Sequence, residues 1–301
     1  MIDVSHKTNS LRTAIAEARI VMKPETLLLT RDGKLPKGDA LTVAKVAAIQ
    51  GCKNTAQLIP YCHPIPLDFV GVNFTFGNDH LVIQVEVKTV WKTGVEVEAI
   101  TGASIGALAI YDMTKMIDDS VVIENIHLVS KKGGKTDLHI DHEKTLRAAV
   151  LVLSDSVSSG TATDLSGKVI EERLLAHGFE ILDFSVIPDE KDLITEKLHS
   201  YADDKVDLVL TTGGTGLGPR DTTPEATMEF IDYEIPGITE LLRHYGQQRT
   251  PFAMLSRGIA GKRGKTLVIN LPGSQRAVVE SLDALFPQLK HAFKMMDGEG
   301  H

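Results

Sequence analysis

The hydrophobic pattern of the chain changes its period near residue 145, and the two patterns are typical of different folds. In the front half, Val70–Phe76 and Leu81–Val87 alternate apolar with small or polar residues, and the intervening Gly77–Asp79 has the composition of a turn. Alternation with period two is typical of strands that bury one face, so these segments predict an antiparallel hairpin. The half also contains two helical stretches and a further strand-like run, at 39–49, about 102–117 and 120–129. This mixture predicts an α+β domain, an antiparallel sheet covered by helices.

The back half carries continuous apolar runs instead of alternating ones, at 148–153, 206–210 and 267–270. Continuous runs of this length predict strands that are buried on both faces. Helical stretches lie between and after them, at 167–177, 191–202, 224–232 and 274–296. Buried strands that alternate with helices predict a doubly wound α/β domain with a parallel sheet.

Length and composition limit the organisation of the chain and its classes of partner. The 301 residues exceed the roughly 100–200 of one domain, so we expect two, at 1–143 and 147–301, joined by the polar run 141–147. The N-terminus lacks signal-peptide character, and only two cysteines occur. No apolar stretch approaches the ~20 residues that cross a bilayer. We therefore expect a cytoplasmic protein without membrane segments.

The charge of the chain is negative and unevenly distributed. The net charge is −8, of which residues 1–145 hold −1 and the remainder −7. Such a balance argues against nonspecific binding to nucleic acid. The acidic back half would need a metal ion to handle phosphates.

Basic side chains recur in the front half at places where the backbone has special properties. Lys37 precedes Gly38, whose backbone freedom would let the lysine project into a pocket. His63 lies in a proline-rich segment, which is rigid and non-helical. The remaining candidates are an i, i+3 pair and the start of a basic loop, at Asp112, Lys115 and Lys131. Each also has a structural interpretation, as a solvated ion pair, a core or surface histidine, or a solvated loop.

Two carboxylates complete this set. Glu96 and Glu98 stand at spacing two, which places them on one face if the segment is extended. Carboxylates accept hydrogen bonds from amines such as those on the edge of a guanine. Cys62 beside His63 has no second cluster of Cys or His nearby in the sequence, so a zinc site is not expected.

Taken together, six separated motifs of residues 1–141 resemble the cyclic pyranopterin monophosphate synthase family. They are Met1–Ser5, Lys37–Asp39, Leu58–Pro64, Lys92–Ala99, Ile110–Met113 and Gly133–Lys135. The resemblance implies a lyase that rearranges a GTP-derived cyclic intermediate, releases pyrophosphate and closes a cyclic phosphate. It also implies a homo-oligomer, a hexamer whose sites form across subunits.

The same resemblance implies roles for individual residues. Lys37 and Lys115 would handle protons or contact phosphate, and Asp112 would orient or activate Lys115. His63 and Lys131 would contact the substrate phosphates. Glu96 and Glu98 would hold the purine-derived end. Clustered lysines suit this chemistry, because their charge stabilises a departing pyrophosphate. A lysine with a lowered pKa can also act as acid or base.

A glycine-rich segment follows the apolar run 206–210 directly. Thr211–Gly218 is a turn at the carboxyl end of a predicted strand, which is where open α/β sheets bind ligands. It is neither the Gly-x-Gly-x-x-Gly dinucleotide pattern nor a P-loop, because no lysine follows the glycines. The segment predicts a phosphate or anion site, with a purely structural turn as the alternative.

Acidic residues follow two of the predicted strands. Asp189 follows the strand-like run 181–187, and Asp221 ends the glycine-rich loop. At neighbouring strand ends the two carboxylates could meet around Mg²⁺, which needs few protein ligands beside phosphate oxygens. Helix capping or a surface turn is the alternative interpretation of each residue.

Motifs of residues 147–301 resemble the molybdopterin adenylyltransferase family. They are Leu153–Asp155, Ile187–Glu190, Thr211–Gly216, Arg220–Asp221, Thr223–Ala226, Leu255–Arg257 and Asn270–Ser274. The resemblance implies transfer of AMP from ATP, with Mg²⁺, to the terminal phosphate of molybdopterin, with Asp189 and Asp221 as catalytic, metal-linked acids. The ligand-contacting residues that it implies are Ser154, Asp155, Gly214, Thr215, Gly216, Ser256, Arg257, Gly273 and Ser274.

The sequence therefore predicts a bifunctional enzyme of molybdenum cofactor biosynthesis, with a lyase in front and a nucleotidyltransferase behind. Its expected small-molecule partners are the GTP-derived intermediate, molybdopterin and ATP. One alternative joins the front enzyme to a non-catalytic molybdopterin-binding or scaffold domain, because related domains bind pterin without activity. Another is a generic α/β nucleotide hydrolase, against which the missing P-loop lysine argues.

Overall fold

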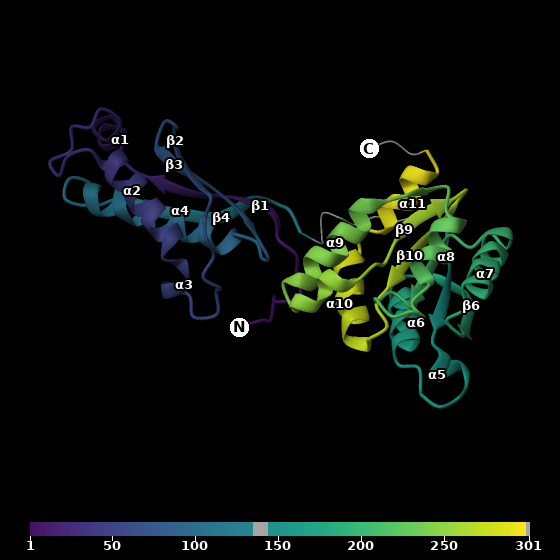
Figure 1. Ribbon diagram of the computed structural model, residues 1–301. Coiled ribbons are helices and arrows are strands. Elements are labelled where there is room, and N and C mark those ends of the chain that lie inside the picture. The colour runs from purple at the N-terminus through teal and green to yellow at the C-terminus, as the bar shows by residue number, and fades with distance from the viewer. Residues whose placement is uncertain (135–143, 299–301) are drawn as a thin grey trace. The chain divides into compact units, whose positions relative to one another are not determined.

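The computed structural model describes residues 1–134 and 144–298, and the chain divides into two compact units, Met1–Asp137 and Leu138–His301 (Figure 1). Lys135 and the predicted junction residues 141–143 lie outside the described residues. Within the described ranges, no helix combines the length and the apolar character needed to span a bilayer. Each unit has a sheet and a hydrophobic core of its own.

The front unit is built on a four-stranded antiparallel sheet in the order β2-β3-β1-β4, which confirms the predicted α+β class. Its strands are β1 (Ser10–Val21), β2 (Phe69–Phe76), β3 (His80–Trp91) and β4 (Val122–Lys132). The predicted hairpin is present as β2 and β3. The long central strand β1 has no counterpart among the predicted elements, because its buried positions include Ala14, Ala16 and Ala18, which give little hydrophobic contrast.

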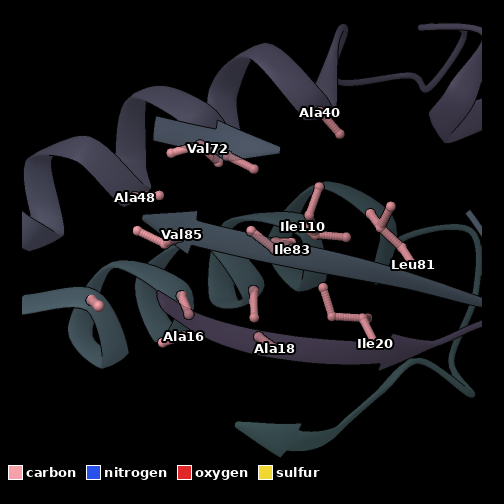
Figure 2. Packing of buried hydrophobic residues seen from close by; sticks show 14 of the residues in the cluster. Ala16, Ala18, Ile20, Ala40, Ala48, Val72, Leu81, Ile83, Val85 and Ile110 are labelled. Carbon is pink, nitrogen blue, oxygen red and sulfur yellow. The ribbon is translucent and has the colours of Figure 1, made fainter. Parts of the chain in front are cut away.

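Helices α2 and α4 pack against each other and against the sheet through small side chains. The helices of this unit are α1 (Pro24–Arg31), α2 (Ala40–Lys53), α3 (Thr55–Leu58) and α4 (Glu96–Thr114). A Cβ atom at Gly102 of α4 would lie 2.3 Å from Cys52 Sγ and 3.1 Å from the carbonyl oxygen of Ala48, both on α2. Figure 2 shows the core that results, in which Ile110 of α4 lies beside Ile83 of β3 and Ala48 of α2 lies near Val85.

We expect Gly102→Ala to lower the free energy of unfolding of the front unit by about 1–3 kcal/mol, because the added methyl group overpacks the contact with Cys52. The loss should appear although alanine favours a helix by about 1 kcal/mol over glycine. Calorimetry of the intact chain measures it, with Leu108→Ala on the exposed side of the same helix as control. An unchanged melting temperature in Gly102→Ala would contradict the close packing.

The back unit contains a six-stranded sheet in the order β6-β5-β7-β10-β9-β8. Its strands are β5 (Arg147–Leu153), β6 (Glu180–Ile187), β7 (Leu208–Thr212), β8 (Tyr233–Glu234), β9 (Ala260–Arg263) and β10 (Thr266–Leu271). The four strands β6, β5, β7 and β10 run parallel. The predicted α/β class is confirmed, with one correction: β9 and β8 form an antiparallel edge. These two strands are short, so neither contributes a continuous apolar run that the sequence pattern could reveal.

Helices cover both faces of this sheet, so that one hydrophobic cluster includes α6, α10 and α11 and the other includes α7 and α8. The helices are α5 (Asp155–Ser158), α6 (Ser166–Ala176), α7 (Lys191–Asp203), α8 (Thr223–Phe230), α9 (Pro236–Gln247), the 3-10 helix η2 (Pro251–Leu255), α10 (Gln275–Leu285) and α11 (Lys290–Met296). The single helix predicted at 274–296 is wrong. It is split into α10 and α11 around Pro287, which has no backbone N–H to continue a helix.

Candidate active sites

A lysine pair and an aspartate meet at the C-terminal end of α4. Lys37 Nζ lies 2.8 Å from Asp112 Oδ2 and also donates to the carbonyl oxygen of Asp112, while Lys115 Nζ lies 2.9 Å from Oδ1. Lys37 reaches this point because Gly38, at φ +97°, turns the chain immediately before Asp39 caps α2. Hydrogen bonds from the two ammonium groups lower the pKa of Asp112 to about 2, and the carboxylate in turn raises the pKa of Lys115. The predicted trio is thus one charged cluster with a net positive charge.

A second group of predicted residues gathers at the N-terminal end of α4. Glu96 forms an ion pair with Lys131, with 3.3 Å between Glu96 Oε1 and Lys131 Nζ. Glu98 is only 3% exposed. Burial raises the pKa of Glu98 to about 6, and the charge of Glu96 adds to the rise. Burial, followed by the charge of Glu98, raises the pKa of the Cys62 thiol, so the segment that carries His63 lies near this end.

The premise that Glu96 and Glu98 belong to an extended segment is wrong. Both residues lie in the first turn of α4, where carboxylates are favoured by the helix dipole. At spacing two on a helix the side chains diverge, so Glu96 meets Lys131 while Glu98 turns into the core.

The two groups of the front unit are far apart within one chain. Glu96 and Asp112 are separated by 16 positions of a continuous helix, or about 24 Å at 1.5 Å per residue. The predicted catalytic lysines and the predicted carboxylates therefore do not converge on one point of a single copy.

The raised pKa of Glu98 predicts that the free energy of unfolding of the front unit depends on pH. Its folded pKa of about 6 lies above the ordinary 4.5, so the folded state holds the proton more tightly than the unfolded state. Stability is therefore lost as pH rises from about 4.5 to about 6, by about 2 kcal/mol. Between pH 4 and pH 7, the free energy of unfolding of Glu98→Gln should rise by that amount relative to the original chain. Urea unfolding measures it. Glu25→Gln, on an exposed turn of α1, is the control, and parallel pH profiles for Glu98→Gln and the original chain would contradict the expectation.

In the back unit the glycine-rich loop follows β7, as predicted. Gly213 and Gly214 have φ of +105° and +60°, and a Cβ at Gly213 would lie 2.0 Å from the carbonyl oxygen of Leu153. Only glycine satisfies both conditions. The Thr223 hydroxyl donates to the carbonyl oxygen of Gly213 and the Asp221 carboxylate accepts from the Gly218 N–H at 2.7 Å, so the loop is held at both ends.

The two predicted metal-linked acids lie against this loop. A Cβ on Gly214 would be 2.8 Å from Asp189 Oδ1, and one on Gly216 would be 3.0 Å from Asp221 Oδ2. The pKa of Asp189 is raised by its burial and by the nearby charges of Asp155 and Asp221. Asp189 and Asp155 also exchange hydrogen bonds between their carboxylates and backbone N–H groups, at 3.2 and 3.1 Å.

The acids fit a hard divalent cation such as Mg²⁺. Asp189 Oδ1 is buried and has no hydrogen-bond partner among the described residues, although buried carboxylate oxygens ordinarily have one. The described residues contain no group of three or more His, Cys, Asp or Glu side chains that could hold a metal ion. A site with so few protein carboxylates suits Mg²⁺, which takes water and phosphate oxygens as its other ligands.

Arg220 joins this acidic cluster, although the sequence patterns assign it no role beyond its place in a motif. Its Nε and Nη2 donate to the two oxygens of Asp155 at 3.1 and 2.9 Å, and its Nη1 donates to Glu190 at 2.8 Å. Hydrogen bonds from the guanidinium lower the pKa of Asp155. Its position directly before Asp221 is the sequence signal that could have indicated it.

Two cavities lie beside the loop and share Gly273. The larger has a volume of about 550 Å³, and the predicted ligand residues that line it are Gly214, Thr215, Gly216, Ser256, Gly273 and Ser274. The lining also includes the apolar side chains of Leu242, Phe252 and Leu255. The smaller, about 310 Å³, is lined by Ser154, Thr212 and Gln275 among others. Ser274 caps α10, so Gly273 and Ser274 lie at a helix N-terminus.

Arg257, like Asp155, is a predicted ligand residue that lines neither cavity beside the loop. Its guanidinium donates to the carbonyl oxygens of Gly216 and Asp221 and pairs with Glu225. Arg257 therefore stabilises the conformation of the glycine-rich loop through these hydrogen bonds.

Comparison with known proteins gives matches to both halves. Residues 1–134 match the MoaC family, and residues 149–291 match a family described as a probable molybdopterin binding domain. A molybdenum cofactor biosynthesis bifunctional protein of Chlorobaculum tepidum is 42% identical over 301 residues, covering 100% of this chain and 96% of that protein. A cyclic pyranopterin monophosphate synthase of Syntrophomonas wolfei is 51% identical over 138 residues, which are 45% of this chain and 88% of that protein. The crystal structure of the molybdopterin biosynthesis enzyme MoaB from Thermus thermophilus is 46% identical, covers 51% of this chain and 98% of its own, and has a TM-score of 0.49.

Proposed function

This chain belongs to the bifunctional proteins of molybdenum cofactor biosynthesis, and on that premise we propose a reaction for each half. The front half, the cyclic pyranopterin monophosphate synthase domain, converts a GTP-derived cyclic intermediate into cyclic pyranopterin monophosphate and releases pyrophosphate. The back half, the molybdopterin-binding domain, transfers AMP from Mg-ATP to the terminal phosphate of molybdopterin. We propose domain limits of 1–143 and 147–301.

The charged cluster of Lys37, Asp112 and Lys115 supports the front reaction. A carboxylate between two lysines keeps Lys115 protonated, because it raises the pKa of that ammonium group. In this state Lys115 is a phosphate ligand and a proton donor, and its charge stabilises the pyrophosphate as it departs. Glu96, paired with Lys131 at the other end of α4, contacts the opposite end of the substrate.

A complete front site needs a second copy of the chain. The lysine cluster and the Glu96–Lys131 pair stand about 24 Å apart on one helix, which no small substrate spans. In a symmetric oligomer the lysine end of one copy can face the carboxylate end of another. The separation of the two groups is the observation that carries this part of the proposal, and the hexamer implied by resemblance is one such assembly.

Mixing two inactive variants tests the shared site. We expect Lys115→Ala and Lys131→Ala each to lower synthase activity by roughly 10²–10³, because each removes a charge from the reacting phosphates. After denaturation and co-refolding, about a quarter of the sites in a mixture combine two intact ends, and that share of activity should return. Formation of cyclic pyranopterin monophosphate measures it.

Lys115→Ala mixed with Lys37→Ala is the matched control, because both changes affect the same end and no intact site can form. Recovery in this control, or none in the first mixture of correctly folded variants, would contradict a site shared between copies.

Adenylylation is supported in the back half by the unpartnered Asp189 Oδ1 beside the glycine-rich loop and Asp221. We propose that Asp189 and Asp221 hold Mg²⁺, which when bound neutralises phosphate oxygens of ATP. The loop N–H groups and the N-terminus of α10 bind anionic groups, and Arg257 keeps the loop in position. The larger cavity, whose lining includes the apolar side chains of Leu242, Phe252 and Leu255, accommodates the pterin.

Turnover of molybdopterin with Mg-ATP tests the back half. We expect Asp189→Asn and Asp221→Asn each to reduce adenylylated pterin and pyrophosphate by roughly 10²-fold or more, because the metal loses a carboxylate ligand. Asp192→Asn, in the first turn of α7, is the control. Tight pterin binding without turnover would favour the non-catalytic scaffold instead, and ATP hydrolysis without pterin would favour a nucleotide hydrolase.

A further inference from the structure

We propose that Arg220 binds the β- and γ-phosphates of ATP and stabilises the pyrophosphate as it leaves, so that it is a catalytic residue of the back half. This inference rests on the proposed adenylyltransferase function and adds a residue to which no role was assigned.

The acidic surroundings of Arg220 favour a positive charge beside the phosphates. The carboxylates of Asp155, Asp189, Glu190 and Asp221 gather at one edge of the sheet, and a triphosphate brings further negative charge to it. Mg²⁺ held by Asp189 and Asp221 compensates part of this charge. Arg220 supplies a fixed positive charge that needs no metal, and a guanidinium stays protonated at any physiological pH.

Arg220 has hydrogen-bond donors left for a ligand. A guanidinium has five N–H groups, and here three of them are engaged by Asp155 and Glu190. One N–H on each of Nη1 and Nη2 remains for a ligand. Since the side chain is 53% exposed, these donors are accessible, and each can donate to a phosphate oxygen. Arg220 can therefore bind phosphate without releasing Asp155.

Hydrogen bonds fix Arg220 in its position. The loop that carries Arg220 is fixed by Arg257 on Gly216 and Asp221, and by the hydrogen bonds that close the turn from Gly218 to Asp221. Asp155 holds the guanidinium and is itself hydrogen-bonded to the backbone of Asp189. The positive charge is thus positioned before the ligand arrives, which is the condition for efficient electrostatic stabilisation.

Calorimetric titration of the full chain with three probes tests the role of Arg220. We expect Arg220→Met to weaken binding of Mg-ATP and of magnesium pyrophosphate by roughly 10- to 100-fold, the effect of losing hydrogen bonds to a charged group. AMP, which has no β- or γ-phosphate, should bind within about twofold of the original affinity. Arg220→Lys keeps the charge but lacks the fork of donors, so we expect an intermediate loss for ATP and pyrophosphate.

Arg173→Met, which breaks an arginine–aspartate pair between α6 and α10, is the matched control for the loss of an ion pair. Equal weakening of AMP, ATP and pyrophosphate in Arg220→Met, or none for any of them, would overturn the proposal, because a merely structural arginine cannot distinguish the probes. The binding measurements need no turnover, so they separate this inference from the adenylylation reaction. A chain that binds ATP through Arg220 but forms no adenylylated pterin would refute the proposed function and the catalytic role of Arg220, while the phosphate contact would stand.

Discussion

The close contact of α4 with α2 determines what the front unit can do. Because Gly102 leaves no room for a side chain beside Cys52 and Ala48, α4 lies against its neighbour as a straight element of 19 residues. Its two ends differ in their charged groups. Lysines surround Asp112 at one end, and the carboxylates Glu96 and Glu98 lie at the other. A helix of this length keeps its two ends about 24 Å apart, which is why the proposed site draws on a second copy.

The back unit depends on a different constraint, the common direction of its central strands. Strands β6, β5 and β7 are parallel, so the residues that follow them meet at one edge. This arrangement brings Asp155, Asp189 and Asp221 together and raises the pKa of Asp189. The hydrogen bonds of Arg220 to Asp155 reduce their mutual repulsion. The front unit gathers lysines at its predicted site and the back unit gathers carboxylates, in agreement with net charges of −1 and −7 for the two halves.

Sequence patterns predicted some strands and site residues of this protein correctly and missed others. The hairpin of the front unit and the buried strands of the back unit were predictable, because alternation and continuous apolar runs reflect burial directly. β1 was not, because alanines fill its buried face. Glu96 and Glu98 were paired on the assumption of an extended backbone, but they lie in a helix and point to different surroundings. Arg257 sits in a motif, yet its contacts are with the loop and not with a cavity, and no spacing rule reveals that.

The sequence by itself determined the two fold classes, the glycine-rich turn after β7 and the residue types available for phosphate chemistry, because local patterns and short motifs express them. The tertiary structure decided which of these residues act together. It joined Lys37 to Asp112 across 75 positions and Arg220 to Asp155 across 65, and it separated Asp112 from Glu96 by the length of one helix. Which residues meet in space depends on how the helices and strands pack. This packing follows from contacts between side chains that are remote in the chain.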